Sequence, residues 1–99
     1  MQAVKETIIN VQEIEPPFRH STIFQVFDDL QEGESLVIHN NHDSLPVYHQ
    51  LINMRGDVLI WEYLQEGPEW WDIRVTKKPR AAQQYFRTKQ GEIVLNIPA

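Results

Sequence analysis

The stretch that decides the fold is residues 16–39, PPFRHSTIFQVFDDLQEGESLVIH. Within it, apolar residues recur at the spacing of one helical face, at Ile23, Phe24, Phe27 and Leu30. The acidic pair Asp28 and Asp29, followed by Gly33, closes this helix. Residues 35–39, SLVIH, form a short apolar run that predicts a strand. A helix that leads directly into a strand predicts part of a β-α-β unit.

The residues before this stretch supply another strand. Residues 7–11 are a short run rich in β-forming residues. The Pro16-Pro17 pair soon after it ends any strand and permits a helix to start. Because a strand then lies on each side of the helix, we expect two parallel strands joined by a right-handed crossover.

A second helix follows the second strand. Asn40 begins a turn signal, NN, where that strand ends. Asp43 or Ser44 is then placed to cap a helix whose first turn holds Pro46. We expect the apolar face of this helix to hold Leu45, Tyr48, Leu51 and Ile52. Gly56 marks its end.

Two β-rich runs, residues 59–64 and 70–76, flank QEGPE. Because Gly67 gives conformational freedom and Pro68 gives rigidity, the runs predict a hairpin. Alternation puts Leu59, Trp61, Tyr63, Trp71, Ile73 and Val75 on one face and Ile60, Glu62, Leu64, Trp70, Asp72 and Arg74 on the other. Residues 1–77 therefore predict a two-layer α/β sandwich of order β-α-β-α-β-β, with a four-stranded mixed sheet and two helices on one face.

This topology gathers polar side chains at one rim of the sheet. Both helices begin where the first two strands end, and a third strand parallel to these brings the hairpin turn to the same rim. The carboxyl ends of parallel strands are where open α/β sheets tend to bind ligands. The residues that converge there are Arg19, His20, His42, Asp43, Glu66 and Glu69, and we expect the first five to bind a ligand.

Composition limits the chemistry available to this rim. The 99 residues include no cysteine, which excludes disulfides, thiolate metal sites and persulfide chemistry. No run approaches the ~20 apolar residues of a membrane span and no signal peptide is visible, so we expect a cytoplasmic protein. Residues 1–76 hold thirteen acidic and four basic residues (−9), and residues 77–99 hold five basic and one acidic (+4). An acidic body disfavours nucleic acid, because phosphate binding needs clustered Lys and Arg.

The C-terminal extension, residues 78–99, contains a weakly helical AAQQYFRTK and a strand-like EIVLNI. Its basic residues suit contact with the acidic body. The sheet face without helices is expected to carry Ile60, Leu64 and Trp70, with Val37 from the second strand. Because exposed apolar groups need a cover, we expect a homodimer in which this face or the extension takes part.

Three segments, PPFRHSTIFQVFDDLQEGESL, NNHDSLPVYHQL and WEYLQEGPEWWDIRV, resemble a family of uncharacterised bacterial domains. The family pattern runs approximately PP..RH..IF..FD.L..GES, then N.HD..P...QL, then W.YL..GP..W...I, and the resemblance covers residues 8–76. It implies the SirA/TusA-like sulfur-carrier fold and association with hemerythrin-like domains or another redox partner, in redox or nitrogen-oxide metabolism. The sulfur carriers place a Cys-Pro motif where this chain has Pro16-Pro17, so persulfide transfer is unavailable here.

His20, His42 and Asp43 match that pattern, whereas His39 and His49 do not. The helical spacing of His20 favours a partly buried imidazole bonded to the backbone or to Asp43, and the alternative is a ligand or proton carrier. Asp43 is expected to cap the second helix. Alternatively, His20 and His42 form a zinc or iron site with Asp43 or Glu66, although their spacing matches no short metal motif and we expect no resident cofactor.

Three functions therefore remain open. The first is a non-enzymatic module that binds a small ligand or a partner at the rim around His20 and His42. The second is a histidine-dependent or metal-dependent enzyme at the same rim. The third is a homodimeric interaction subunit that uses the open sheet face.

Overall fold

Alternating β-rich and amphipathic segments give the chain its order of elements. The computed structural model describes residues 6–79. The elements are β1 (Glu6–Asn10), the 3-10 helices η1 (Val11–Glu13) and η2 (Pro16–Phe18), α1 (Arg19–Asp29), β2 (Ser35–Asn40), α2 (Leu45–Arg55), β3 (Leu59–Glu66) and β4 (Trp71–Lys77). Their order is the predicted β-α-β-α-β-β, with strand boundaries shifted by one or two residues.

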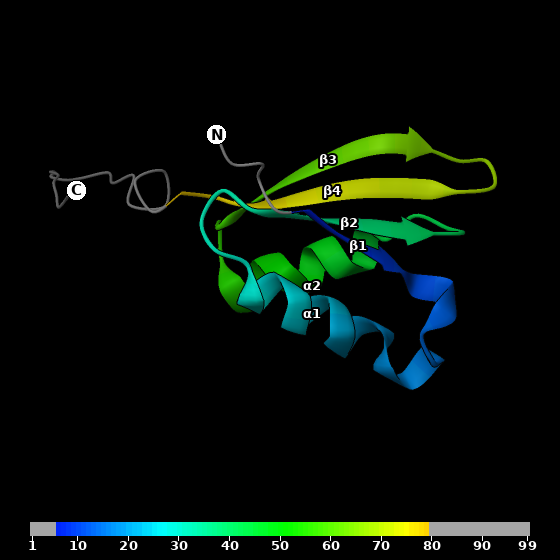
Figure 1. The fold of residues 1–99 in the computed structure, drawn as a ribbon, viewed down its shortest axis with the longest axis horizontal. Coiled ribbons are helices and arrows are strands. Elements are labelled where there is room, and N and C mark those ends of the chain that lie inside the picture. Colours follow the sequence, from blue (N-terminus) through cyan, green and yellow to red (C-terminus); the bar gives the residue numbers. More distant parts are fainter. Residues whose placement is uncertain (1–5, 80–99) are drawn as a thin grey trace, which may run out of the picture.

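A mixed sheet forms one layer, and both helices pack on the same face of it (Figure 1). The strand order is β1-β2-β4-β3. β1 and β2 are parallel, and β4 is antiparallel to both of its neighbours. β3 therefore runs parallel to β1 and β2, as a shared rim requires. The predicted α+β two-layer fold is confirmed.

Residues with special backbone preferences set the helix boundaries. Pro16 and Pro17 begin the short turn that leads into α1, where the missing N–H of proline is tolerated. Pro46 lies in the first turn of α2 for the same reason. Gly56 ends α2 with φ of 84°, a conformation that only glycine adopts without strain.

The core lies between the sheet and the helices and is almost entirely aliphatic. Its buried members are Ile9, Val11, Ile23, Phe27, Leu30, Leu36, Ile38, Val47, Leu51, Leu59, Ile73 and Val75. The expected face of α2 is wrong in one position, because Leu45 is 41% exposed while Val47 is buried. Two residues along a helix differ by about 200° in direction. The stripe of α2 that faces the sheet therefore centres on Val47 and Leu51.

The open sheet face carries more polar contacts than alternation suggested. Arg74 on β4 donates to Glu62 on β3 and reaches across β2 to Glu6 on β1. Val37 pairs with Arg74 in the sheet and is only 7% exposed, so the expectation that Val37 needs an external cover is wrong. Large apolar side chains that remain exposed there are Ile60, Leu64 and Trp70, together with Ile8 on β1, which pairs with Val37 and is 69% exposed.

The described chain ends just past β4. Lys77 exchanges backbone hydrogen bonds with Gly33 and Glu34, which ties the end of β4 to the turn before β2. Within residues 6–79, neither helix has the length and apolar character needed to cross a membrane. The predicted helix and strand of the C-terminal extension lie outside the described residues.

Candidate functional site

One rim of the sandwich collects the ends of five elements. The carboxyl ends of β1, β2 and β3 and the amino ends of α1 and α2 lie at the edge drawn on the right of Figure 1. A cavity of about 180 Å³, called here the rim cavity, lies between the starts of the two helices. It is lined by Val11, Pro16, Arg19, His20, Ile23, Asn40, His42, Asp43, Ser44, Pro46 and Val47.

Four of the five predicted ligand-binding residues line the rim cavity. Arg19 and His20 come from the first turn of α1, and His42 and Asp43 come from the loop between β2 and α2. The β-α-β crossover brings these two distant pairs together. Glu66 is exposed at the end of β3 and does not line the cavity.

His20 is exposed, which corrects the partly buried position expected from its helical spacing. Its Nδ1 atom lies 2.9 Å from Oε1 of Gln50 on α2, so its partner is neither the backbone nor Asp43. Spacing fixes the direction in which a side chain points but not how far the core extends along the helix. In α1 the buried residues begin only at Ile23, one turn later.

Arg19 brings a permanent positive charge to the rim cavity. Its Nε atom donates to the backbone carbonyl of Ile14 at 2.9 Å, which holds the side chain at the rim. Its two terminal nitrogens make no further hydrogen bond to other residues of the 6–79 range. His42 is exposed, and its Nδ1 atom lies 2.8 Å from Oδ1 of Asn41, which leaves the Nε2 atom for a ligand or for water.

Two buried polar residues form the base of the rim cavity, Asn40 at 4% and Ser44 at 2% exposed. Oδ1 of Asn40 accepts from the backbone N–H of Asn41 and from Nε2 of Gln12, both at 2.8 Å. A backbone N–H can only donate, which fixes the orientation of the amide. Nδ2 of Asn40 therefore donates to Oγ of Ser44 at 3.2 Å. Ser44 occupies the N-cap position of α2, but its side chain makes no cap hydrogen bond.

Asp43 does not cap α2 either. Its Oδ1 atom accepts a hydrogen bond from the hydroxyl of Tyr63 on β3 at 2.9 Å. Burial raises the pKa of Tyr63, and the nearby Asp43 carboxylate adds to this because a negative charge disfavours the phenolate. The charge of Glu66 raises the pKa of Tyr63 in the same direction. Tyr63 keeps its proton and holds Asp43 in place.

No three or more histidine, aspartate or glutamate side chains are grouped to hold a metal ion in the part of the chain that the structure describes. His20, His42 and Asp43 share the rim cavity, yet each has its own separate hydrogen-bond partner. The described geometry therefore gives no support to a zinc or iron site on these three side chains.

Sequence reasoning missed the role of the two most buried polar residues of the site. It interpreted Asn40 as a turn signal and Ser44 as a helix cap. A signal for Asn40 was present, because alternation along β2 places it on the same buried face as Leu36 and Ile38. For Ser44, the sequence held no signal that its hydroxyl would turn toward Asn40.

A second missed contact lies on the open sheet face. Nδ1 of His39 lies 2.5 Å from Oδ1 of Asp72, and the ring of Trp70 stacks on the imidazole at 4.3 Å between centroids. The antiparallel register of β2 and β4 places His39 beside Asp72. His39 lies 33 positions from Asp72 in the sequence, so only the pairing of β2 with β4 brings it beside Asp72 and Trp70.

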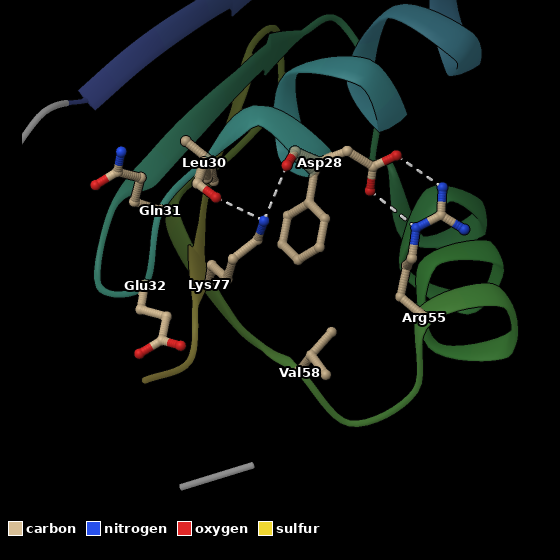
Figure 2. Close-up of a pocket in the computed structure, with 8 residues that line it drawn as sticks. Asp28, Leu30, Gln31, Glu32, Arg55, Val58 and Lys77 are labelled. Carbon is tan, nitrogen blue, oxygen red and sulfur yellow. Dashed lines mark hydrogen bonds and ion pairs between the residues drawn. The ribbon is translucent and has the colours of Figure 1, made fainter. Parts of the chain in front are cut away.

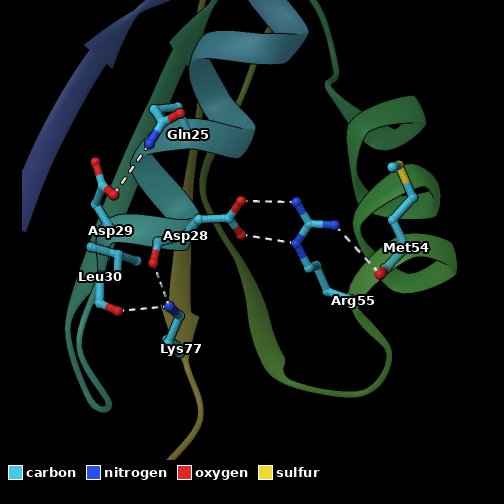
Figure 3. A network of polar contacts seen from close by, with 7 residues as sticks. All are labelled: Gln25, Asp28, Asp29, Leu30, Met54, Arg55 and Lys77. Atoms are coloured by element: carbon cyan, nitrogen blue, oxygen red, sulfur yellow. Dashed lines mark hydrogen bonds and ion pairs between the residues drawn. The ribbon is translucent and has the colours of Figure 1, made fainter.

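A larger pocket, of about 670 Å³, lies at the opposite rim (Figure 2). Its lining is Phe27, Asp28, Leu30, Gln31, Glu32, Arg55, Val58 and Lys77. Figure 3 shows that its charges bind one another: Asp28 accepts two hydrogen bonds from Arg55, at 2.8 and 2.9 Å. Lys77 donates to the backbone carbonyls of Asp28 and Leu30, at 3.1 and 2.6 Å. These contacts close the end of α1, so we assign this pocket a structural role.

Residues 8–77 match the model of a family described as an uncharacterized conserved protein, DUF2249. No curated protein and no solved structure matches the chain. The matched residues include every residue that lines the rim cavity, and the family description supplies no activity.

Proposed function

The chain belongs to the DUF2249 family of uncharacterised conserved proteins. From the geometry of its rim we propose that it is a small-ligand-binding module whose site is the rim cavity. One observation carries the proposal: buried hydrogen-bonding groups, a permanent cation and an apolar surface face the same cavity. An apolar pocket with a few oriented polar groups is typical of ligand sites. The position at the carboxyl ends of parallel strands supports the same function.

The size of the rim cavity limits the ligand to a few heavy atoms. Its volume is about 180 Å³. Pockets for drug-sized ligands are larger, on the order of 300–1,000 Å³. We therefore expect a metabolite-sized fragment rather than a nucleotide.

Binding is favoured over covalent catalysis by the surroundings of Ser44. Its hydroxyl is bonded to the amide of Asn40 rather than to a histidine or a carboxylate. A serine nucleophile needs an adjacent base to remove its proton. Among the described residues of the cavity, Ser44 therefore suits recognition of a ligand better than attack on one.

The proposal is tested by an NMR screen of the ¹⁵N-labelled, untagged chain against a library of small polar fragments. We expect hits that shift the amide resonances of residues around the rim cavity. His42→Ala is expected to weaken these hits, because His42 lines the cavity. His49→Ala is the matched control, since His49 is exposed on α2 outside the cavity. Hits that map elsewhere, or that respond equally to both variants, would remove the proposed site.

A second candidate function, a homodimeric interaction subunit, is favoured by the open sheet face. Ile60 and Leu64 are exposed on β3, and Trp70 is exposed in the turn that follows it. β3 is an edge strand, but the charge of Glu62 and the irregular register after Tyr63 oppose pairing with another strand. Contact between the open faces of two copies is therefore the favoured mode.

A further inference from the structure

We propose that the ligand of the rim cavity is a small monocarboxylate with a short aliphatic part, an inference that rests on the proposed binding function. Three features of the cavity carry it, an available buried donor, a fixed cation and an apolar wall, and the acidic surrounding body limits the charge of the ligand.

The available buried donor is the hydroxyl of Ser44. The backbone N–H of Asn41 fixes the amide of Asn40, and this amide donates to Oγ of Ser44. The Ser44 oxygen is therefore an acceptor in that bond, and its own hydrogen remains to be donated. Ser44 is 2% exposed, and no acceptor among residues 6–79 takes this hydrogen. A buried donor of this kind needs an acceptor atom, and a ligand oxygen in the cavity supplies one.

The fixed cation is the guanidinium of Arg19. Its Nε atom is occupied by the carbonyl of Ile14, so the side chain is held at the cavity before any ligand arrives. The terminal nitrogens remain to donate, and a guanidinium matches the geometry of a carboxylate. Ser44 and Arg19 both line the rim cavity, so each can donate to the carboxylate of a ligand placed in it.

The apolar wall decides between a carboxylate and an inorganic oxyanion. The buried side chains of Val11, Ile23 and Val47 line the cavity, and two prolines complete this side. These groups offer nothing to the oxygens of phosphate or sulfate, whereas an aliphatic chain of a few carbons gains by leaving water. The volume of about 180 Å³ matches a carboxylate with such a chain.

The acidic surroundings limit the negative charge of the ligand, whereas the guanidinium of Arg19 is the group that attracts an anion. Asp43 lines the same cavity and is held there by Tyr63. The chain carries a net charge of −5. A negative body repels a dianion more strongly than a monoanion. A ligand with one carboxylate is therefore favoured over a phosphate ester or a dicarboxylate.

The inference is tested by NMR titration of the untagged full chain with sodium butyrate, butanol and butylammonium chloride at equal ionic strength. The three probes share an aliphatic chain and differ in their polar group. We expect butyrate to shift the amide resonances around Ser44 with an affinity at least about tenfold above those of the other two, because a hydrogen bond to a charged group is worth that much or more. A butanol or butylammonium affinity equal to that of butyrate would overturn the inference while leaving the proposed function standing.

Two variants locate the interaction. Ser44→Ala and Arg19→Gln are each expected to weaken butyrate binding by about tenfold or more, with little change for butanol. Ser21→Ala is the matched control and should bind as the wild type does, since Ser21 is exposed and bonded to the carbonyl of Phe18. If Ser44→Ala fails to fold, the butyrate affinity of Arg19→Gln alone tests the inference. Unchanged butyrate affinity in a folded variant would overturn the inference.

If none of the three probes shifts the amide resonances of cavity residues in the wild type, the inference fails. The proposed function fails with it only if the fragment library is also without a hit.

Discussion

Single hydrogen bonds give the two rims of this sandwich different roles. At the rim opposite the cavity, Arg55 donates two hydrogen bonds to Asp28. Lys77 donates to the backbone carbonyl of Leu30 at the end of α1. At the rim cavity, by contrast, Ser44 and Arg19 retain donors that no described residue uses. Charge that is satisfied internally supports the fold, and donors left available support recognition.

The Asp28–Arg55 ion pair predicts a pH dependence of stability. The hydrogen bond from Arg55 lowers the pKa of Asp28 below its ordinary value of 3.8. A carboxyl whose pKa is lower in the folded state stabilises that state above its unfolded pKa, and this contribution is lost as the pH falls through the folded value. Asp28→Asn is expected to lower the free energy of unfolding by about 0.5 kcal/mol at neutral pH, because both side chains are partly exposed.

Urea denaturation of the wild type and of Asp28→Asn at several pH values measures this effect. The difference between them should stay constant between about pH 5 and 8 and shrink toward zero in strong acid. Asp29→Asn is the control, because it removes the same charge from the same turn of α1 without touching Arg55. A difference that persists in strong acid would assign the effect to something other than the ion pair.

Tyr63 predicts a second effect at the residue scale. Tyr63→Phe removes the hydrogen bond to Asp43 and is expected to lower the free energy of unfolding by about 1 kcal/mol. Tyr48→Phe is the control, since Tyr48 packs its ring on Trp61, 5.2 Å between centroids, and should lose much less. Equal losses for the two variants in urea denaturation would contradict a stabilising role for the Asp43 contact.

At the scale of elements, α2 shows why a helical pattern places a face only approximately. Its sequence, LPVYHQLINMR, has apolar residues in nearly every direction, so several stripes fit the same spacing. The sheet below it selects the stripe that contains Val47 and Leu51. Leu45 is left near solvent at the start of the helix.

The stripe predicts the stability of two alanine variants of α2. Val47→Ala removes two buried methyl groups and is expected to cost roughly 1–3 kcal/mol. Leu45→Ala removes more atoms, but from an exposed position, and is expected to change stability by about 0.5 kcal/mol or less. Urea denaturation compares the two directly. A larger loss for Leu45→Ala would show that the other stripe faces the sheet.

At the scale of the whole molecule, one layer of helices leaves one face of the sheet open. Arg74, Glu6 and Glu62 cross that face and screen Val37 from water. Ile8, Ile60, Leu64 and Trp70 are left exposed on the same face as this polar bridge. The case for a partner therefore rests on these four side chains and not on Val37.

We predict that the chain is a homodimer through this face. Light scattering at tens of micromolar should give twice the monomer mass, because a C2 contact buries each patch against its own copy. Ile60→Lys should shift the mass toward the monomer, since Ile60 is 48% exposed on the open face. Met54→Lys, an equally drastic change at an exposed position of α2, should leave the dimer intact.

The C-terminal extension is tested separately by deleting residues 80–99. The deletion begins after Pro79 because Lys77 holds the end of α1 and Lys78 pairs with Asp57. Loss of the dimer in this shortened chain would assign the contact to the extension. A wild-type chain that scatters as a monomer would remove both versions of the prediction.

The sequence by itself determined the order of the elements, the side of the sheet that the hairpin residues face outside the register shift after Tyr63, and the rim where Arg19, His20, His42 and Asp43 meet. These features depend on local spacing, on turn residues and on the handedness of a β-α-β crossover, all of which act over short stretches of chain. The absence of cysteine likewise excluded thiol chemistry without any structure.

Only the tertiary structure decided which polar groups are used and which are left available. The amide of Asn40 donates to Oγ of Ser44, and the hydroxyl of Tyr63 donates to Asp43. His20 is hydrogen-bonded to Gln50. These choices depend on strand order, register and the depth of the core, which join residues far apart in the chain. A hydrogen bond needs its partner within about 3 Å and well aligned, a condition that spacing along the sequence does not set.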